Sequence, residues 1–199
     1  MFAEKITPEE IDRLPLCAFE GKIEVIDKPD RSFNNAIRYL SSKRLLGFDT
    51  ESRPCFTAEE PRHGTALVQL SGAEKAFLFR VNTLGMHRRL LAILGNPNII
   101  KVGAAVHDDV RGLQKIHGFQ PAGFVDLQKM VESYGIREKS VKKMSAIVLG
   151  VRISKSQQLS NWEAETLSEA QQVYAATDAW ICRQMYKKLQ VSEIVASDV

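Results

Sequence analysis

Two acidic residues at the end of an apolar stretch are the first sign of chemistry in this chain. The segment 45–48 carries no charge and is followed by Asp49, Thr50 and Glu51. In an extended strand successive side chains alternate between faces, so Asp49 and Glu51 share one face and Thr50 lies on the other. Neighbouring carboxylates repel each other unless a cation compensates them, and hard divalent ions prefer oxygen ligands. The pair predicts a metal site, although Asp-x-Glu also arises by chance.

Tyr174 and Asp178 stand four positions apart near the C-terminal end of the sequence. Because four positions span about one helical turn, both side chains lie on one face of a helix. Other residues recur on this face at helical spacing: Leu167, Ala170, Ile181 and Met185. A buried phenol one turn before a carboxylate can hold a water molecule beside a carboxylate-bound metal. The simpler interpretation is a core tyrosine bonded to its helical neighbour.

A third acidic segment, Asp108 and Asp109, lies between these two. It follows an apolar run over 98–106 that predicts a buried strand, and it begins a predicted helix. An aspartate at this place is favoured as an N-cap because its carboxylate meets free backbone N–H groups. Asp109 is the better candidate for chemistry because it shares a helix face with Leu113 and Ile116, the residues expected to point inward. Asp108 is the candidate for the cap.

In this order the three segments resemble the tyrosine subtype of the DEDD exonuclease superfamily, which includes RNase D and Werner-type exonuclease domains. The motifs that carry the resemblance are 48–51, 102–113 and 174–178. Two further segments, 66–70 and 157–162, are similar to the second strand and to the approach to the last motif in those domains. The resemblance implies an α/β, ribonuclease H-like, three-layer fold. Its sheet is expected to be mixed and five-stranded or slightly larger, with helices on both faces.

The resemblance also implies a reaction. Two divalent cations, Mg²⁺ or Mn²⁺, are expected to be held by Asp49, Glu51, Asp109 and Asp178, while Tyr174 orients the attacking water. The product is expected to be a nucleoside 5′-monophosphate released from the 3′ end of DNA or RNA. The alternative is a catalytically inactive exonuclease fold that binds nucleic acid. An oligoribonuclease-like enzyme is disfavoured because it usually carries His in place of the Tyr, and RNase H or recombinase chemistry because it lacks this Tyr-x-x-x-Asp pattern.

Candidate contacts to nucleic acid are polar or basic residues near the acidic motifs: Thr50, His107, Lys142, Lys143 and Lys155. Further basic residues add density along the segments that precede the last motif: Lys101, Arg137, Lys139 and Arg152. Contacts of this kind to phosphates give affinity without sequence preference. For any one of these residues a solvated surface is the simpler interpretation. The preference between DNA and RNA, and any protein partners, stay open.

Size and composition agree with one catalytic domain. The chain has 199 residues, of which 44% are hydrophobic, and 27 basic residues nearly balance 24 acidic ones. It can therefore bury one substantial core, while its net charge of +3 does not by itself indicate a nucleic-acid partner. Cys17, Cys55 and Cys182 show no zinc-like or disulfide-like spacing, so we expect reduced thiols and a cytoplasmic location. No leader and no membrane association are expected.

We expect an N-terminal arm over 1–21, an exonuclease domain over 22–192 and a short tail over 193–199. Strands are predicted at 22–26, 45–50, 66–70 and 75–81, the last two forming a hairpin. Helices are predicted at 8–13, 32–40, 86–94, 108–117, 127–134, 141–149 and 168–189. An antiparallel opening followed by alternating strands and helices is typical of a mixed sheet covered on both faces.

Overall fold

The computed structural model describes residues 1–57, 59–61 and 63–194. Its centre is a six-stranded sheet of order β1-β4-β3-β2-β5-β6. The strands are β1 Lys22–Ile26, β2 Leu45–Ser52, β3 Thr65–Ser71, β4 Lys75–Arg80, β5 Ile100–Gly103 and β6 Phe124–Asp126. Strand β3 runs antiparallel to both β2 and β4, and the other neighbours are parallel. The predicted mixed sheet is therefore confirmed, with one strand more than five.

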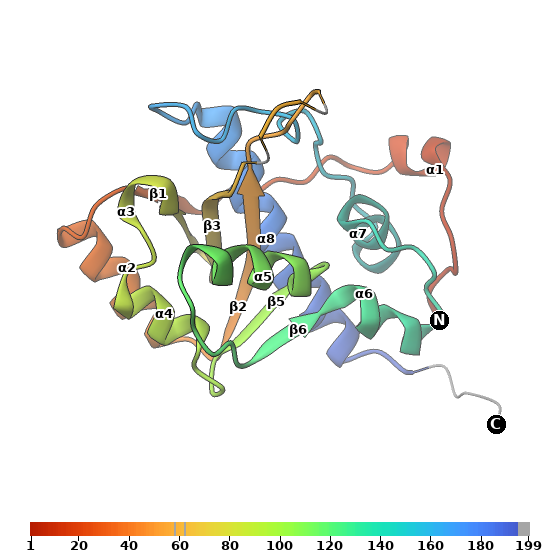
Figure 1. Cartoon of the computed structure of the whole chain (residues 1–199). Coiled ribbons are helices and arrows are strands. Elements are labelled where there is room, and N and C mark those ends of the chain that lie inside the picture. The colour runs from red at the N-terminus through yellow and green to blue at the C-terminus, as the bar shows by residue number, and fades with distance from the viewer. Residues whose placement is uncertain (58, 62, 195–199) are drawn as a thin grey trace.

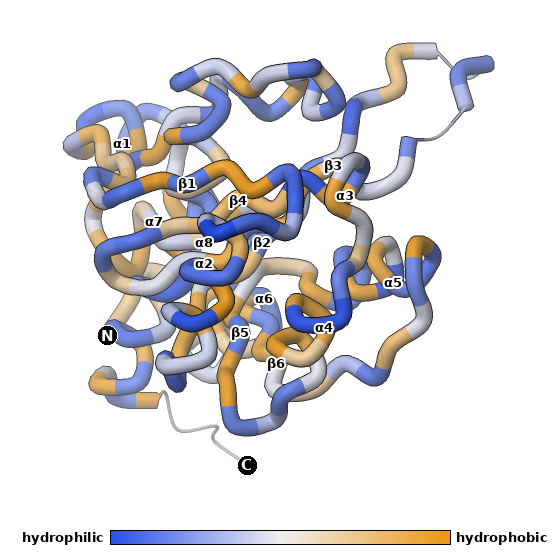
Figure 2. Tube along the Cα trace, turned by 90° about the vertical axis from the view of Figure 1, so that its left-hand side faces the viewer, coloured by the Kyte–Doolittle hydropathy of each residue, from blue (hydrophilic) through white to orange (hydrophobic). Residues whose placement is uncertain are grey.

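Helices cover both faces of this sheet (Figure 1). They are α1 Pro8–Asp12, α2 Arg31–Ser41, α3 Val81–Leu84, α4 Arg88–Leu94, α5 Val106–Ile116, α6 Leu127–Met130, α7 Val141–Leu149 and α8 Glu169–Gln190, with a 3₁₀ turn at Val131–Tyr134. Helices α2, α4 and α5 bury apolar residues against one face. Helices α7 and α8 bury theirs against the other face. Figure 2 shows that the peripheral turns are mostly hydrophilic and that hydrophobic residues gather toward the strands.

Helix α8 packs on strand β2 at unusually close range, and glycine makes this possible. A Cβ atom added to Gly47 would lie 1.8 Å from the carbonyl oxygen of Ala179. Any larger residue at position 47 would therefore push the helix away from the strand. The contact places the residue before Ala179, which is Asp178, beside the residues that follow Gly47 on the same face of β2.

Two sequence-based expectations about α5 are wrong. The helix begins at Val106 after Ala105, which adopts the left-handed conformation with φ of 56° and makes no side-chain cap. Asp108 and Asp109 therefore both lie inside the first turn, and Asp108 is not the N-cap. Ile116 was expected to point inward but is 42% exposed, because the helix ends at this residue. Ala170 is likewise exposed, since α8 begins only one residue before it.

The segment before β1 contacts the segments that lead into and form α8. Backbone N–H groups of Arg152 and Cys17 donate to the carbonyls of Pro15 and Arg152, at 3.0 and 2.8 Å. Further along, the N–H of Phe19 donates to Thr177 Oγ1 on α8 at 2.9 Å. The boundaries at 21 and 192 stay a prediction, and the predicted tail from 195 onward lies outside the described residues. None of the described helices combines the length and the apolar character that a membrane span requires.

Candidate active site

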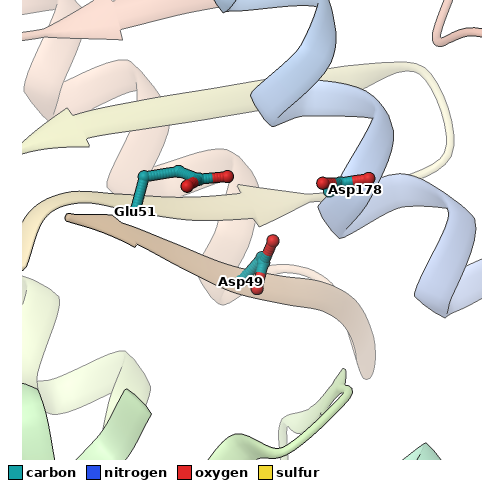
Figure 3. Close-up of side chains that lie close together, drawn as sticks. All are labelled: Asp49, Glu51 and Asp178. Atoms are coloured by element: carbon teal, nitrogen blue, oxygen red, sulfur yellow. The ribbon is translucent and has the colours of Figure 1, made fainter. Parts of the chain in front are cut away.

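Three carboxylates meet where β2 passes under α8. Asp49 and Glu51 come from the strand and Asp178 comes from the helix, and one oxygen of each lies within 4.8 Å of the others. Figure 3 shows the three side chains directed toward one shared space. The strand alternation that puts Asp49 and Glu51 on this face turns Phe48 to the opposite face, where its ring packs edge-on against Phe124 at 5.1 Å between centroids. Packing of the apolar residues of β2 thus holds Asp49 and Glu51 in their positions on the other face of the strand.

Burial and mutual repulsion raise the pKa of each of these carboxyl groups. For Asp49 the rise is large, because the group is buried and because Asp178, Glu51 and Asp109 add their negative charge. Burial and Asp178 raise the pKa of Glu51 to about 8, against the opposing charge of Lys155. Burial also raises the pKa of Asp178, and Lys155 and the Tyr174 phenol act in the opposite direction. Such a group of acids is stable as carboxylates only beside a cation.

The arrangement fits a hard divalent cation. All its donors are carboxylate oxygens, which are the ligands that Mg²⁺ and Mn²⁺ prefer. Asp178 Oδ1 is buried and has no hydrogen-bond partner among the described residues. A buried acceptor without a partner is costly, and a bound cation would satisfy it. Asp49, Glu51 and Asp178 can therefore hold a metal ion.

Asp109 lies next to this trio without being part of it. Its Oδ1 accepts a hydrogen bond of 2.5 Å from Thr50 Oγ1, the side chain on the other face of β2. Burial raises the pKa of Asp109 to about 6, while the Thr50 hydroxyl acts in the opposite direction. Asp109 is close enough for its charge to raise the pKa of Asp49 and of Glu51, whereas Asp108 is exposed. The Thr50 hydroxyl, predicted as a substrate contact, is engaged within the protein.

Tyr174 is buried one turn before Asp178, with 6% of its surface exposed. Its ring lies 5.9 Å from that of Trp162, centroid to centroid, and the Lys155 ammonium lies 5.6 Å from its centroid. Burial raises the pKa of Tyr174, and the charges of Asp178 and Glu51 raise it further. The phenol therefore keeps its proton and offers a hydrogen-bond donor next to the acids.

The predicted cationic contacts divide into three groups. Lys155 points into the acidic site, with Nζ 3.6 Å from Asp178 Oδ2. Lys143 pairs with Glu138 on its own side of the molecule at 3.0 Å. His107 is exposed and lines a cavity of about 410 Å³ together with Asp126 and Lys129, whereas Lys142 is half-buried on α7.

Lys101 was interpreted as part of the basic surface, and this is wrong. The side chain is fully buried, and its Nζ donates to the carbonyls of Ile93 and Asn96 at 3.1 and 2.8 Å. Two other members of that set, Arg137 and Lys139, pair with Glu4 and Glu132.

Sequence reasoning missed two polar residues that shape the site. Asp126 Oδ1 accepts from the N–H groups of Ala105 and Gln128 at 3.1 and 2.9 Å, so it caps α6 and fixes the left-handed turn before α5. An aspartate at the start of the predicted helix at 127 was the available signal. Arg80 is buried and donates to the carbonyls of Ala164 and Glu165, which anchors the segment before α8. No local pattern marks this second role.

The mixed sheet with helices on both faces, which carries the acidic site between β2 and α8, is a ribonuclease H-like fold. Residues 24–192 match a family model described as 3′-5′ exonuclease, and the chain belongs to this family. Exonuclease 3′-5′ domain-containing protein 2 of Drosophila melanogaster is 32% identical over 160 residues, which are 78% of this chain and 27% of that protein. The bifunctional 3′-5′ exonuclease/ATP-dependent helicase WRN of Mus musculus is 31% identical over 188 residues, 89% of this chain and 13% of that protein.

Solved structures show the same fold. The Nibbler EXO domain of Aedes aegypti superposes with a TM-score of 0.72 at 22% identity, covering 94% of this chain and 91% of that one. RNase D of Escherichia coli superposes with a TM-score of 0.73 at 24% identity, covering 85% of this chain and 44% of that one. The chain thus spans about one eighth to about one quarter of the length of the curated relatives named above, since its coverage of them is 13% and 27%.

Proposed function

We propose that this chain is a metal-dependent 3′-5′ exonuclease that hydrolyses the terminal phosphodiester of DNA or RNA and releases nucleoside 5′-monophosphates. The observation that carries the proposal is the convergence of Asp49, Glu51 and Asp178 within 4.8 Å, in a chain of the 3′-5′ exonuclease family. Buried carboxylates at such close range are unfavourable for the fold alone. A catalytic use of cations explains why they are present.

We assign Asp49, Glu51, Asp109 and Asp178 as the residues that would hold two divalent cations, Mg²⁺ or Mn²⁺. When bound, such cations supply Lewis-acid activation of water and neutralise charge at the leaving oxygen. Asp109 contributes from one side, oriented by the hydroxyl of Thr50 at 2.5 Å. Because this hydrogen bond fixes the rotamer of Asp109, the side chain loses less conformational entropy when it binds a cation.

Tyr174 is proposed as the residue that orients the attacking water, as in the tyrosine subtype of these enzymes. The phenol is held against Trp162 and lies one turn from Asp178. Since its pKa is raised, it acts by hydrogen bonding to the water and does not begin the reaction as a phenolate. A positioned group of this kind typically contributes about 10²–10⁴ in rate.

We infer the substrate class from the relatives and from three basic residues, of which His107 is exposed and Lys142 and Lys143 are half-buried. One Trypanosoma brucei RNase D was solved in complex with RNA, at 22% identity and a TM-score of 0.75. We propose a nucleic acid with a free 3′ end, contacted by His107, Lys142 and Lys143 at its phosphates. The three cysteines are unpaired in the described residues, which supports a reducing compartment such as the cytoplasm.

The test is cleavage of single-stranded DNA, duplex DNA and RNA with Mg²⁺, Mn²⁺ or EDTA. A 5′ label should give a descending ladder and a 3′ label should give mononucleotide first, in each case without product in EDTA. Asp49→Asn removes a ligand at constant volume and should abolish turnover, whereas the matched variant Asp108→Asn on the exposed face of α5 should retain it. Binding without cleavage on every substrate would favour the inactive nucleic-acid-binding module instead.

A further inference from the structure

Lys155 brings a positive charge into the carboxylate site from outside. Its Nζ lies 3.6 Å from Asp178 Oδ2 and 5.6 Å from the centroid of the Tyr174 ring. The Lys155 side chain is 30% exposed and that of Asp178 is 5% exposed, so the lysine reaches inward from the surface. Within the described part of the chain, no other Lys, Arg or His nitrogen lies within 4.0 Å of an oxygen of the three carboxylates.

The backbone on either side of Lys155 is held in place. Arg152 hydrogen-bonds to the N-terminal segment through its N–H, its carbonyl and its Nε, the last donating to Leu14 O at 3.0 Å. Ser154 and Ser156 are linked by a hydroxyl hydrogen bond of 3.0 Å, and the Ser156 N–H donates to Ser154 Oγ at 3.2 Å. Lys155 therefore lies between two linked serines, in a segment that Arg152 anchors to residues 14–17.

The Lys155 side chain has room to move because it is 30% exposed to solvent. A cavity of about 430 Å³ next to this segment is lined by Ser154, Ser156, Cys17 and Tyr174, whereas Lys155 itself does not line it. The ammonium can therefore leave Asp178 toward solvent by rotamer changes alone. Exposed rotamer changes take picoseconds to nanoseconds, so such a movement would not limit turnover.

We propose that Lys155 is a tethered counter-ion that compensates the carboxylates before metal binds and gives up Asp178 when a divalent cation arrives. This inference rests on the proposed function, because it needs a metal site at Asp49, Glu51 and Asp178. It differs from a phosphate contact, which would act only on nucleic acid. An ammonium at 3.6 Å from a ligand oxygen opposes a second cation at the same oxygen by Coulomb repulsion.

Lys155 therefore has opposite effects on the two states of the site. In the metal-free protein it lowers the cost of the buried negative charges, so its removal should lower the melting temperature. Toward a metal it acts as a competitor, so its removal should tighten binding. At an effective dielectric between that of a protein surface and water, the lost repulsion corresponds to roughly tenfold to a hundredfold in Kd.

The experiment is a calorimetric titration with Mn²⁺ at pH 8.5 without nucleic acid, joined to thermal melts in EDTA and in Mn²⁺. Lys155→Met should bind Mn²⁺ roughly ten to a hundred times more tightly than wild type. Its melting temperature in EDTA should be lower than that of wild type, and Mn²⁺ should raise its melting temperature by more. Lys155→Arg keeps the charge and should stay near wild type in both measurements. Lys115→Met, at an exposed position on α5, is the control and should change neither.

Each outcome decides between the proposals. An Mn²⁺ affinity that is equal in wild type and Lys155→Met overturns the counter-ion role and leaves the metal site standing. A wild-type protein that binds no Mn²⁺ overturns the metal site, and the displacement role falls with it. A weaker affinity in Lys155→Met, with Lys155→Arg unchanged, would make the ammonium a supporter of metal binding and would also overturn the proposal.

Discussion

Replacing Lys101 by Met should change the way in which stability depends on pH. Lys101 is fully buried on β5, and its ammonium lies 5.1 Å from the centroid of the Phe124 ring. The two carbonyls to which it donates also accept backbone N–H groups, Ile93 O from Asn96 at 3.2 Å and Asn96 O from Ile99 at 3.3 Å. The substitution therefore removes a buried charge, keeps most of the volume and leaves no carbonyl without a partner.

Burial lowers the pKa of Lys101 from 10.5 to about 8. Between these values the unfolded chain holds a proton that the native protein has released, so stability rises with pH across this range. Below the lower value the native protein carries the buried ammonium, which costs about 3 kcal/mol relative to the neutral amine, since one pKa unit is about 1.4 kcal/mol. Lys101→Met has no ammonium, so this cost of a buried charge is absent from the variant at every pH. The variant should therefore be at least as stable as wild type at pH 7. Because wild type becomes more stable as the pH rises, the difference in the free energy of unfolding should shift by about 2 kcal/mol in favour of wild type between pH 7 and pH 10.

Urea denaturation of wild type and Lys101→Met at pH 7, 8, 9 and 10 measures this difference. Other tyrosines, lysines and cysteines titrate in the same range, but they contribute equally to both proteins and cancel in the comparison. Lys115→Met, on the exposed side of α5, is the control and should show no pH-dependent difference from wild type. A constant free-energy difference between wild type and Lys101→Met from pH 7 to pH 10 would refute the reasoning.

Three further predictions concern the site. Tyr174→Phe should fold and bind Mn²⁺ like wild type but lose on the order of 10²–10⁴ in turnover, measured on labelled single strands; an unchanged rate would leave the phenol a core residue only. Asp109→Ala should be inactive while Asp108→Ala keeps its rate, and the reverse result would exchange their roles. Gly47→Ala forces α8 away from β2, so urea melts should show a loss of about 1–3 kcal/mol; a stability equal to wild type would mean that the helix can retreat freely.

The placement of the three clustered carboxylates and of Tyr174 could be predicted because these residues lie on regular elements. The alternation of β2 placed Asp49 and Glu51 on one face, and the helical repeat of α8 placed Tyr174 and Asp178 on its buried side. A periodic pattern states which face a residue occupies, and a buried face that carries acids is informative by itself. The mixed sheet followed from the same patterns. Local sequence was therefore sufficient to place these residues on their faces, whereas their assignment to one site came from the family resemblance.

The first residue of α5 could not be predicted from local sequence patterns. A helix beginning at Asp108 is the ordinary expectation for an acidic residue after a strand. In the structure Asp126 on β6 accepts the N–H of Ala105 at 3.1 Å, which stabilises a left-handed residue and lets the helix start two positions earlier. A contact between residues 105 and 126 leaves no trace in the hydrophobic repeat of either segment. The hydrogen bond between Thr50 and Asp109 could not be predicted either, because these residues are also far apart in the sequence.

Tertiary contacts also decide the charge environment of Lys101 and Lys155, which the sequence does not show. From the sequence, Lys155 was predicted as a phosphate contact and Lys101 as part of the basic density around such contacts. Lys101 lies at the end of α4, where the carbonyls of Ile93 and Asn96 accept its hydrogen bonds. Lys155 lies beside Asp178, in a segment that Arg152 anchors to residues 14–17. Carbonyl dipoles stabilise a cation without neutralising it, so Lys101 keeps a lowered pKa, whereas Lys155 Nζ lies 3.6 Å from the acidic side chain of Asp178. One lysine therefore bears on stability at alkaline pH, and the other bears on the affinity of the acidic site for a cation.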